Sequence, residues 1–227
     1  MDEPALVDAA RAGDRDAFNQ LVVHYQSLAY NVAYRILGDP DAAADATQDA
    51  FFSAYRAMAR FRGGSFRSWV LRIVTNACYD QLRVKKRRPT TSLDADPDLD
   101  WEEWTVDEGE RPEEFVERQG LSQLIQEGLA ALPDDQRMVI VLSDIQGLRY
   151  GEIAETLGVS LGTVKSRLNR GRRRLRGFLQ EKRELLPARY RLTNRGGPGA
   201  GVMNWLAERV GDGFVARLLR RGTDRYG

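Results

Sequence analysis

The chain has 227 residues, of which 42% are hydrophobic, and a formal net charge of only +1 at pH 7. That length accommodates one large domain or two small ones, and the apolar content is high enough to build cores, which excludes wholesale disorder. A single cysteine, Cys78, and a single histidine, His24, exclude an internal disulfide and a Cys/His metal cluster, so we expect neither a metal nor a cofactor.

Two sequence features argue against a membrane or exported protein. No apolar run approaches the ~18 residues that a membrane-spanning helix needs. The first residues, MDEPALVDAA, lack the basic and then apolar pattern of a signal peptide. We therefore expect a cytoplasmic protein without membrane insertion.

Helical periodicity begins near residue 5 and continues to about residue 88. Between Phe18 and Leu37 the apolar residues recur at steps of three and four, which is the pattern of an amphipathic helix. Asp39 and Pro40 predict the start of a second helix, because Asp caps free backbone N–H groups and Pro is tolerated in the first turn. This second helix is expected to bury Ala46, Ala50, Phe51, Ala54, Tyr55 and Met58.

A third helix is predicted to begin after the Gly63–Gly64 pair, because Ser65 is a good N-terminal cap. Apolar residues then follow at helical spacing, namely Trp69, Ile73, Ala77 and Leu82. Pro89 ends this helix after a run of basic residues. Cys78 lies within it and is expected to be a buried or half-buried thiol, since free cysteine is a mostly buried residue type.

Residues 90–117 have a different character, because they are rich in Asp and Glu and contain one basic residue, Arg111. A segment of this composition cannot bury itself and is predicted to be an extended, flexible acidic linker. Trp101 and Trp104 are unusual in a spacer, since large apolar side chains gain nothing there unless a partner covers them.

Helical periodicity returns from about Leu121 to Gln180, and Tyr150–Arg176 has the spacing of a helix-turn-helix. Ala154 is small enough for a helix contact, and Gly158 suits the left-handed turn. Val164 is expected to pack the second helix onto the first, and Ser160 to cap the second helix.

The second helix of this motif carries no acid from Lys165 to Arg176, a stretch that includes Arg172, Arg173, Arg174 and Arg176. Such a helix fits the DNA major groove, where Arg and Asn read base edges and other cations hold phosphates. A solvated basic helix is the alternative, although solvated helices usually interleave acids for pairing at i,i+4. The candidate DNA-contacting residues are Ser160, Thr163, Lys165, Ser166, Arg167, Asn169, Arg170 and Arg173.

Two further polar faces lie in the first helical segment. On the second helix one face is formed by Asp45, Gln48, Asp49, Phe52 and Arg56, and an aromatic ring among acids favours a contact surface over a plain solvated face. On the third helix Arg72, Asn76, Tyr79 and Arg83 form a stripe beside the Gly63–Gly64 loop, which suits single-stranded DNA. Packing roles for Asn76 and Tyr79 remain the alternative.

Three stretches together resemble the extracytoplasmic-function group of bacterial RNA polymerase sigma factors. They are DAAADATQDAFF (residues 41–52), FRSWVLRIVTNACYDQLR (residues 66–83) and LPDDQR (residues 132–137), the last followed by EIA (residues 152–154) and TVKSR (residues 163–167). The resemblance implies that the first stretch docks on the polymerase clamp coiled coil, the second opens and reads the −10 element, and the third belongs to a domain that binds the −35 element and the polymerase flap. The family often has an acid at the position of Ala44, so this departure is expected to weaken clamp docking slightly. It usually has Ala at that of Gly171, where glycine is expected to loosen the end of the recognition helix.

By this resemblance, the residues of the polymerase contact are Asp45, Gln48, Asp49, Phe52 and Arg56. The −10 contact is expected on the melted non-template strand, and the −35 contact on duplex DNA. The residues of the −10 contact are Phe61, Arg62, Gly63, Gly64, Ser65, Phe66, Trp69, Arg72, Asn76, Tyr79, Arg83, Lys85 and Lys86. The acidic linker is expected to thread the basic active-site cleft of the polymerase, and an anti-sigma factor is a further possible partner.

We therefore expect an all-α protein of two small helical domains joined by an acidic flexible linker. The expected boundaries are residues 1–89 for a region-two helical bundle, 90–117 for the linker, 118–182 for a region-four helix-turn-helix domain and 183–227 for a C-terminal extension. The expected function is that of a sigma factor and not of an enzyme. No nucleotide-hydrolysis motif is present, so we expect binding energy to drive the opening of the promoter. The alternatives are a helix-turn-helix repressor or activator that needs no polymerase, and a module that sequesters a basic partner.

The C-terminal extension has no counterpart in the minimal family pattern. An apolar stripe at helical spacing is formed by Val202, Trp205, Leu206, Val210, Phe214, Leu218 and Leu219, with Arg209, Arg217, Arg220 and Arg221 beside it. A free helix of this kind is marginal in water and needs a surface. The membrane interface, the polymerase and the protein's own domains are the candidates, and we favour docking onto protein.

Overall fold

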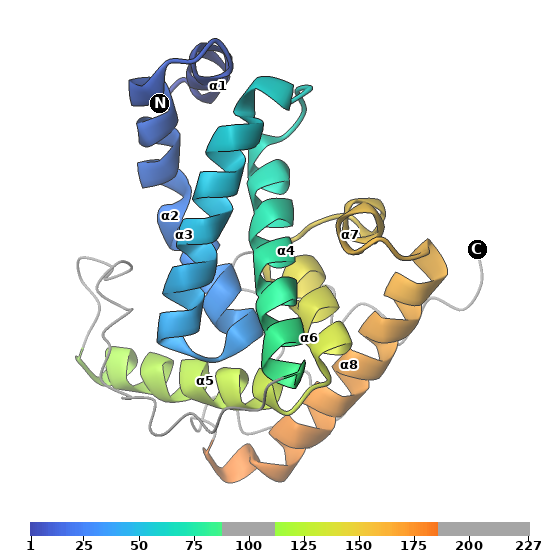
Figure 1. Ribbon diagram of the computed structural model, residues 1–227. Helices are drawn as coiled ribbons and strands as arrows, with labels where there is room; N and C mark the ends of the chain where they lie inside the picture. The colour runs from blue at the N-terminus through green and yellow to red at the C-terminus, as the bar shows by residue number, and fades with distance from the viewer. Residues whose placement is uncertain (88–111, 186–227) are drawn as a thin grey trace. The chain divides into compact units, whose positions relative to one another are not determined.

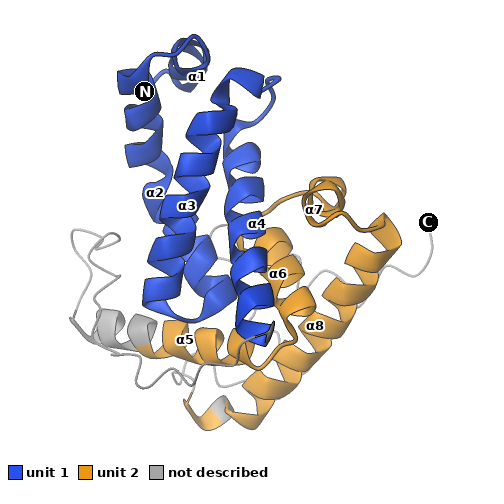
Figure 2. Ribbon diagram, viewed as in Figure 1, with its two compact units in different colours: residues 1–105 blue, residues 106–227 orange. Residues whose placement is uncertain are grey.

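A computed structural model describes residues 1–87 and 112–185, and these residues form helices and no strand. The chain divides into two compact units, Met1–Thr105 and Val106–Gly227, shown in Figure 2. The predicted all-α class with two helical domains is thereby confirmed, while the exact domain boundaries stay a prediction. No helix among the described residues is long and apolar enough to cross a membrane.

The first unit is a bundle of helices (Figure 1). Its elements are α1 (Glu3–Arg11), α2 (Arg15–Leu37), α3 (Pro40–Ala57), the short 3₁₀ helix η1 (Met58–Arg60) and α4 (Phe66–Arg87). Helices α2, α3 and α4 pack against one another, and α1 packs on α2. The buried face of α3 consists of alanines, namely Ala43, Ala46, Ala50 and Ala54. Such small side chains let neighbouring helices approach closely.

The helix boundaries in this unit follow the predicted caps. Asp39 Oδ1 accepts a hydrogen bond from the Ala42 N–H at 3.0 Å, and Ser65 Oγ accepts one from the Ser68 N–H at 3.2 Å. Pro40 occupies the first turn of α3, as predicted. The prediction that α3 buries Tyr55 is wrong, because this side chain is 44% exposed. Its ring makes an edge contact with that of Phe18, with 5.1 Å between centroids.

The second unit contains the helix-turn-helix. Its elements are α5 (Pro112–Ala130), α6 (Asp134–Ile140), the π-helical turn η3 (Val141–Ile145), α7 (Tyr150–Leu157), α8 (Leu161–Glu181) and the 3₁₀ helix η4 (Arg183–Leu185). Residues 112–117, which we expected in the linker, are helical. The physical reason is that a proline and two following glutamates suit the first turn of a helix, where N–H groups are free and negative charge is favoured.

A buried arginine holds the α5–α6 connection. Arg137 Nε donates to the carbonyl of Leu129 at 2.9 Å, and its Nη2 donates to the carbonyls of Ala130 at 3.2 Å and Leu132 at 3.1 Å. The carbonyls of Leu129 and Ala130 lie in the last turn of α5, where the regular i+4 hydrogen bonds of the helix end, and that of Leu132 lies in the connection. Burial lowers the pKa of the Arg137 guanidinium, and the charge of Asp134 opposes that effect. Arg137 therefore acts as a C-terminal cap delivered from the next helix.

Two glycines allow α8 to lie close to its neighbours. A Cβ atom on Gly171 would lie 3.0 Å from Cγ1 of Ile140 in α6, and a Cβ on Gly128 of α5 would lie 2.7 Å from Cδ1 of Leu175. Gly171 is itself buried. The sequence predicted only that Gly171 loosens the end of α8; in the structure its missing side chain is what permits the α6–α8 contact. The expected helix at Val202–Leu219 lies outside the described residues.

Candidate nucleic-acid interface

The turn of the helix-turn-helix has the predicted geometry. Gly158 adopts a left-handed conformation with φ of 62° and donates its N–H to the Ala154 carbonyl. Ser160 Oγ accepts the Thr163 N–H at 3.1 Å and lies 2.9 Å from the Thr163 hydroxyl. Val164 and Ile153 are fully buried and pack α8 on α7. The first turn of α8 is therefore fixed both by its cap and by its apolar contacts.

The exposed face of α8 carries most of the predicted DNA-contacting residues. Exposed side chains at helical spacing on this face are Lys165, Ser166, Asn169, Arg170 and Arg173. The face includes two arginines, a lysine and an asparagine, the residue types that bind phosphates and read base edges in the major groove. Ser160 and Thr163 lie at its N-terminal end, where their hydroxyls are engaged in the cap.

Arg167 differs from these residues, because it is paired with an acid. Its Nε lies 2.9 Å from Oδ2 of Asp135 in α6, and its side chain is only 23% exposed. Arg167 is therefore only partly exposed in this structure, and its contact with DNA stays a prediction. The pairing connects residues far apart in the sequence, which helical periodicity alone cannot indicate.

Arg172 is also not part of the exposed basic run. Its guanidinium forms two hydrogen bonds with the carboxylate of Asp144, through Nε at 2.8 Å and through Nη2, and Asp144 is fully buried. Burial lowers the pKa of Arg172, but the hydrogen bond and the charge of Asp144 outweigh that effect and raise it. Arg172 thus joins α8 to the turn after α6. Sequence reasoning missed Asp135 and Asp144 as the partners that hold α8.

A second polar stripe follows α4 in the first unit. Arg72 and Asn76 are exposed, Tyr79 is 46% exposed, and the Arg83 guanidinium lies 5.9 Å from the centroid of the Tyr79 ring. Lys85 and Lys86 extend the stripe and are exposed. An aromatic ring flanked by cations and an amide is a suitable surface for an unpaired base and its phosphates.

The loop before α4 is held at both ends by aromatic side chains. Phe61 and Phe66 are 5% and 1% exposed, with ring centroids 5.8 Å apart. The half-buried Trp69 contacts both, at 5.0 and 5.5 Å. Phe61 and Phe66 therefore belong to the core, and their predicted contact with DNA is not supported by their position. The exposed residues of the loop are Arg62, Gly63, Gly64 and Ser65.

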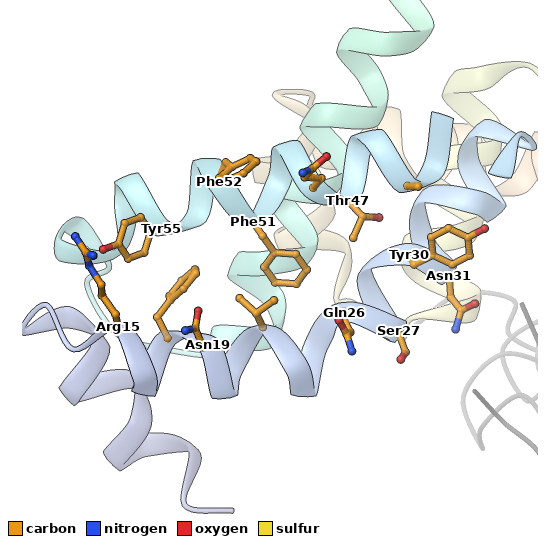
Figure 3. A pocket seen from close by; sticks show the side chains of 14 residues that line it. Arg15, Asn19, Gln26, Ser27, Tyr30, Asn31, Thr47, Phe51, Phe52 and Tyr55 are labelled. Carbon is orange, nitrogen blue, oxygen red and sulfur yellow. The ribbon is translucent and has the colours of Figure 1, made fainter. Parts of the chain in front are cut away.

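The third predicted face lies on α3. All of its members are exposed, namely Asp45, Gln48, Asp49, Phe52 and Arg56, and the Phe52 ring is 58% exposed. Beside this face a groove of about 780 Å³ runs between α2 and α3, and Gln48 and Phe52 belong to its lining (Figure 3). Sequence reasoning missed the α2 wall of this groove, which includes Val22 and Tyr30. Among the described residues no group of His, Cys, Asp and Glu could hold a metal ion.

Fold and site together define a DNA-binding protein with a helix-turn-helix unit and a separate helical bundle. Family models agree: residues 21–88 match Sigma-70 region 2, and residues 122–175 match Sigma-70 region 4. The chain is 38% identical over 184 residues to the ECF RNA polymerase sigma factor SigE of Mycolicibacterium smegmatis, covering 78% of this chain and 69% of that protein. It is 38% identical over 180 residues to the ECF RNA polymerase sigma factor SigW of Bacillus subtilis, covering 77% and 95%.

Solved structures of similar fold include a sigma factor. One is the sigma factor RpoE in complex with the anti-sigma factor NepR from Bartonella quintana, with a TM-score of 0.56, 25% identity and coverage of 72% of this chain and 96% of that one. Another is CnrH in complex with the cytosolic domain of CnrY, with a TM-score of 0.54, 28% identity and coverage of 78% and 96%.

The chain belongs to the ECF group of RNA polymerase sigma factors. It is a transcription initiation factor that directs RNA polymerase to promoters, which confirms the predicted family and function. The two family models leave residues 1–20, 89–121 and 176–227 unmatched, which includes the acidic segment and the C-terminal extension.

Proposed function

We propose that α8 reads the −35 element through its exposed face, with Lys165, Asn169 and Arg170 at its centre. The single observation that carries this proposal is the projection of cations and an amide from one capped, acid-free helix face. Ser160, Thr163 and Ser166 lie at its N-terminal end and are suited to phosphate oxygens, because free N–H groups favour anions there. Arg173 extends the face for a further phosphate contact.

The −10 element is assigned to the exposed loop Arg62–Ser65 and to the α4 stripe. Asn76 is the amide that reads a base, Tyr79 is the ring on which a base stacks, and Arg72 and Arg83 hold phosphates. Trp69, Lys85 and Lys86 flank this path. Phe61 and Phe66 support the loop from below. Strand opening by such a surface is driven by the binding energy of unstacked bases, typically about 1–3 kcal/mol for each base–aromatic stack.

Core polymerase is assigned to the α3 face, with Asp45, Asp49 and Arg56 as its charged members. Exposed Phe52 supports this assignment, because a large ring surrounded by charge is typical of a contact surface. The resemblance assigns the clamp coiled coil to this face, the flap to the second unit and the active-site cleft to the acidic segment. Solved relatives are complexes with NepR and with the cytosolic domain of CnrY, so a similar anti-sigma partner is proposed here. Because RNA polymerase is an internal enzyme, the site of action is the cytoplasm.

Transcription by purified core polymerase from a matched promoter, with and without the protein, tests the function as a whole. A repressor or activator that needs no polymerase would bind the −35 duplex tightly alone and would leave core transcription unchanged. Lys165→Ala and Arg170→Ala should each weaken −35 binding by about 1–3 kcal/mol while core binding stays intact. Lys182→Ala, which removes the same charge at the far end of α8, is the matched control.

The −10 assignment is tested with a promoter library transcribed by Asn76→Ala. Base preference should change at one position of the melted element and should stay unchanged at −35. An unaltered −10 profile would give Asn76 a purely structural role.

The polymerase assignment is tested by co-purification with core enzyme. Asp49→Arg combined with Phe52→Ala should reduce complex formation strongly, since a like-charge contact at an interface costs several kcal/mol. Asp8→Arg places the same charge reversal on α1 and should leave the complex intact. If the double variant co-purified with core enzyme as well as the wild-type protein does, α3 would not be part of the interface.

A further inference from the structure

Helix α1 lies before the residues that match the region 2 model, which begin at residue 21. It packs on α2 through the buried residues Val7 and Ala10, and it also packs on η1, the element that leads toward the Arg62–Ser65 loop. Figure 1 shows α1 at the end of the bundle where α4 begins. This helix is therefore placed to hold the part of the chain that precedes the loop.

A hydrogen bond also joins α1 to α2. The Tyr25 hydroxyl donates to Oε2 of Glu3, which lies in the first turn of α1. Tyr25 is 5% exposed and Glu3 is half-buried. A buried hydroxyl without a partner is costly, and a hydrogen bond to a carboxylate is stronger than one between neutral groups. Burial and the contact with Glu3 raise the pKa of Tyr25, although Arg67 lowers it, so the hydroxyl keeps its proton and stays a donor.

The ring of Tyr25 connects this hydrogen bond to the loop. Its centroid lies 5.5 Å from that of Phe66, which is the first residue of α4 and directly follows the Arg62–Ser65 loop. Phe66 in turn contacts Phe61, at the other end of the loop, with 5.8 Å between ring centroids. Helix α1 thus reaches one end of the loop through η1 and the other end through Tyr25 and Phe66.

We propose that the hydrogen bond between Tyr25 and Glu3 is a latch through which α1 holds the Arg62–Ser65 loop in the conformation that reads the melted −10 strand. Glu3 and Tyr25 are positioning residues, because Tyr25 is buried and acts through Phe66 and not by contact with DNA. Close-packed interiors transmit small displacements, so loss of the latch lets Phe66 shift and the loop with it. The proposal rests on the proposed −10 function of this loop.

A promoter library randomised at −10 tests the latch, with transcription by core polymerase assembled with the full-length protein. Tyr25→Phe removes only the hydroxyl and keeps the ring beside Phe66, and Glu3→Ala removes the acceptor. Each is expected to reduce discrimination among −10 sequences about three- to tenfold. The double variant should lose no more than either single variant, because all three break the same hydrogen bond. Selection at −35 and co-purification with core enzyme should stay at the wild-type level.

Two matched variants separate the hydrogen bond from a change of charge. Glu3→Gln keeps an oxygen acceptor for the Tyr25 hydroxyl and should retain wild-type discrimination. Asp8→Ala removes a carboxylate from an exposed position of α1 and should retain it as well. A purely structural role would lower thermal stability and total transcript without altering the −10 profile. An unaltered profile in Tyr25→Phe and Glu3→Ala would therefore overturn the latch.

Failure of the −10 assignment itself has a different signature. Gly63→Ala combined with Gly64→Ala strains the loop directly, because these glycines have φ of 89° and 92°, while nothing lies within 4 Å of either Cβ position. This variant should lose −10 discrimination whether or not the latch exists. An unchanged profile in it would overturn the −10 assignment of the loop and the latch with it. A changed profile in it, with an unchanged one in Tyr25→Phe, would overturn the latch alone.

Discussion

Arg172 in α8 is joined by two hydrogen bonds to the fully buried carboxylate of Asp144, a residue 28 positions earlier in the turn after α6. Ser143 Oγ donates a further hydrogen bond to Asp144 Oδ1 at 3.1 Å. The pair holds Arg172 against η3, with its side chain only 14% exposed, whereas its neighbours Arg170 and Arg173 are exposed.

Removal of one member of this buried pair should destabilise the second unit. Arg172→Met leaves the Asp144 carboxylate buried without its cation, which typically costs about 3–5 kcal/mol. Urea unfolding followed by circular dichroism measures the loss. Arg173→Met removes an exposed arginine one residue away and should change stability by less than about 0.5 kcal/mol. Equal stability of the two variants would show that the pair does not hold α8.

Asp135 should restrain the DNA affinity of α8. Arg167 must leave the Asp135 carboxylate before it can bind a phosphate or base, so Asp135→Ala is expected to tighten −35 duplex binding about two- to fivefold, in line with an exposed ion pair worth up to about 1 kcal/mol. Fluorescence anisotropy with a labelled duplex at fixed salt measures this change. Asp134→Ala is the control, because it removes the same charge from an acid that pairs with Arg137 and leaves the Arg167–Asp135 pair in place. If Asp134→Ala tightened binding to the same extent, the effect of Asp135→Ala would be due to net charge alone.

Gly171 and Gly177, both in α8, should respond differently to enlargement. Gly171→Leu inserts a side chain where a Cβ already lies 3.0 Å from Ile140 Cγ1, so overpacking should cost about 1–3 kcal/mol. A Cβ on Gly177 meets nothing within 4 Å, and Gly177→Leu should stabilise the helix by up to about 0.8 kcal/mol through helix propensity. Thermal unfolding of both variants checks the opposite signs.

Cys78 should make the first unit less stable at alkaline pH. Burial raises the pKa of this thiol from its ordinary 9.0 to about 12, so above pH 9 the unfolded chain releases a proton that the folded chain retains. The contribution of the protonated thiol to the free energy of unfolding is fully present below pH 9, and it decreases by about 1.4 kcal/mol between pH 8 and pH 10. Urea unfolding at both pH values should show this loss in the wild-type protein and a smaller one in Cys78→Ala. Parallel losses would assign the pH dependence to other groups.

Local features of the fold could be predicted from the sequence because their causes are local. Asp39, Ser65 and Ser160 each cap a helix through a side-chain oxygen, and Gly158 takes the left-handed conformation that the turn requires. Each depends on residues within four positions. The exposure of Lys165, Ser166, Asn169 and Arg170 on α8 could be predicted in the same way, since exposure on one helix follows its periodicity.

The features that could not be predicted depend on contacts between distant segments. Arg167 and Arg172 lie in the same acid-free stretch as Arg170 and Arg173, yet acids from α6 and η3 hold the first two. Phe61 and Phe66 flank an exposed glycine loop, and only the bundle shows that both rings are buried. The groove was missed because it needs residues from α2 and α3 at once.

The two buried phenylalanines on either side of the Arg62–Ser65 loop, Phe61 and Phe66, also lower the conformational-entropy cost of binding a ligand to that loop. Gly63 and Gly64 have φ of 89° and 92°, a left-handed path that only glycine adopts without strain, and nothing approaches a Cβ position at either within 4 Å. Fixing one backbone residue costs roughly 1–2 kcal/mol of entropy, and here the core fixes both ends of the loop during folding. The two ends of the loop are therefore preorganised. A nucleotide that binds there has to order only the four residues between the two phenylalanines.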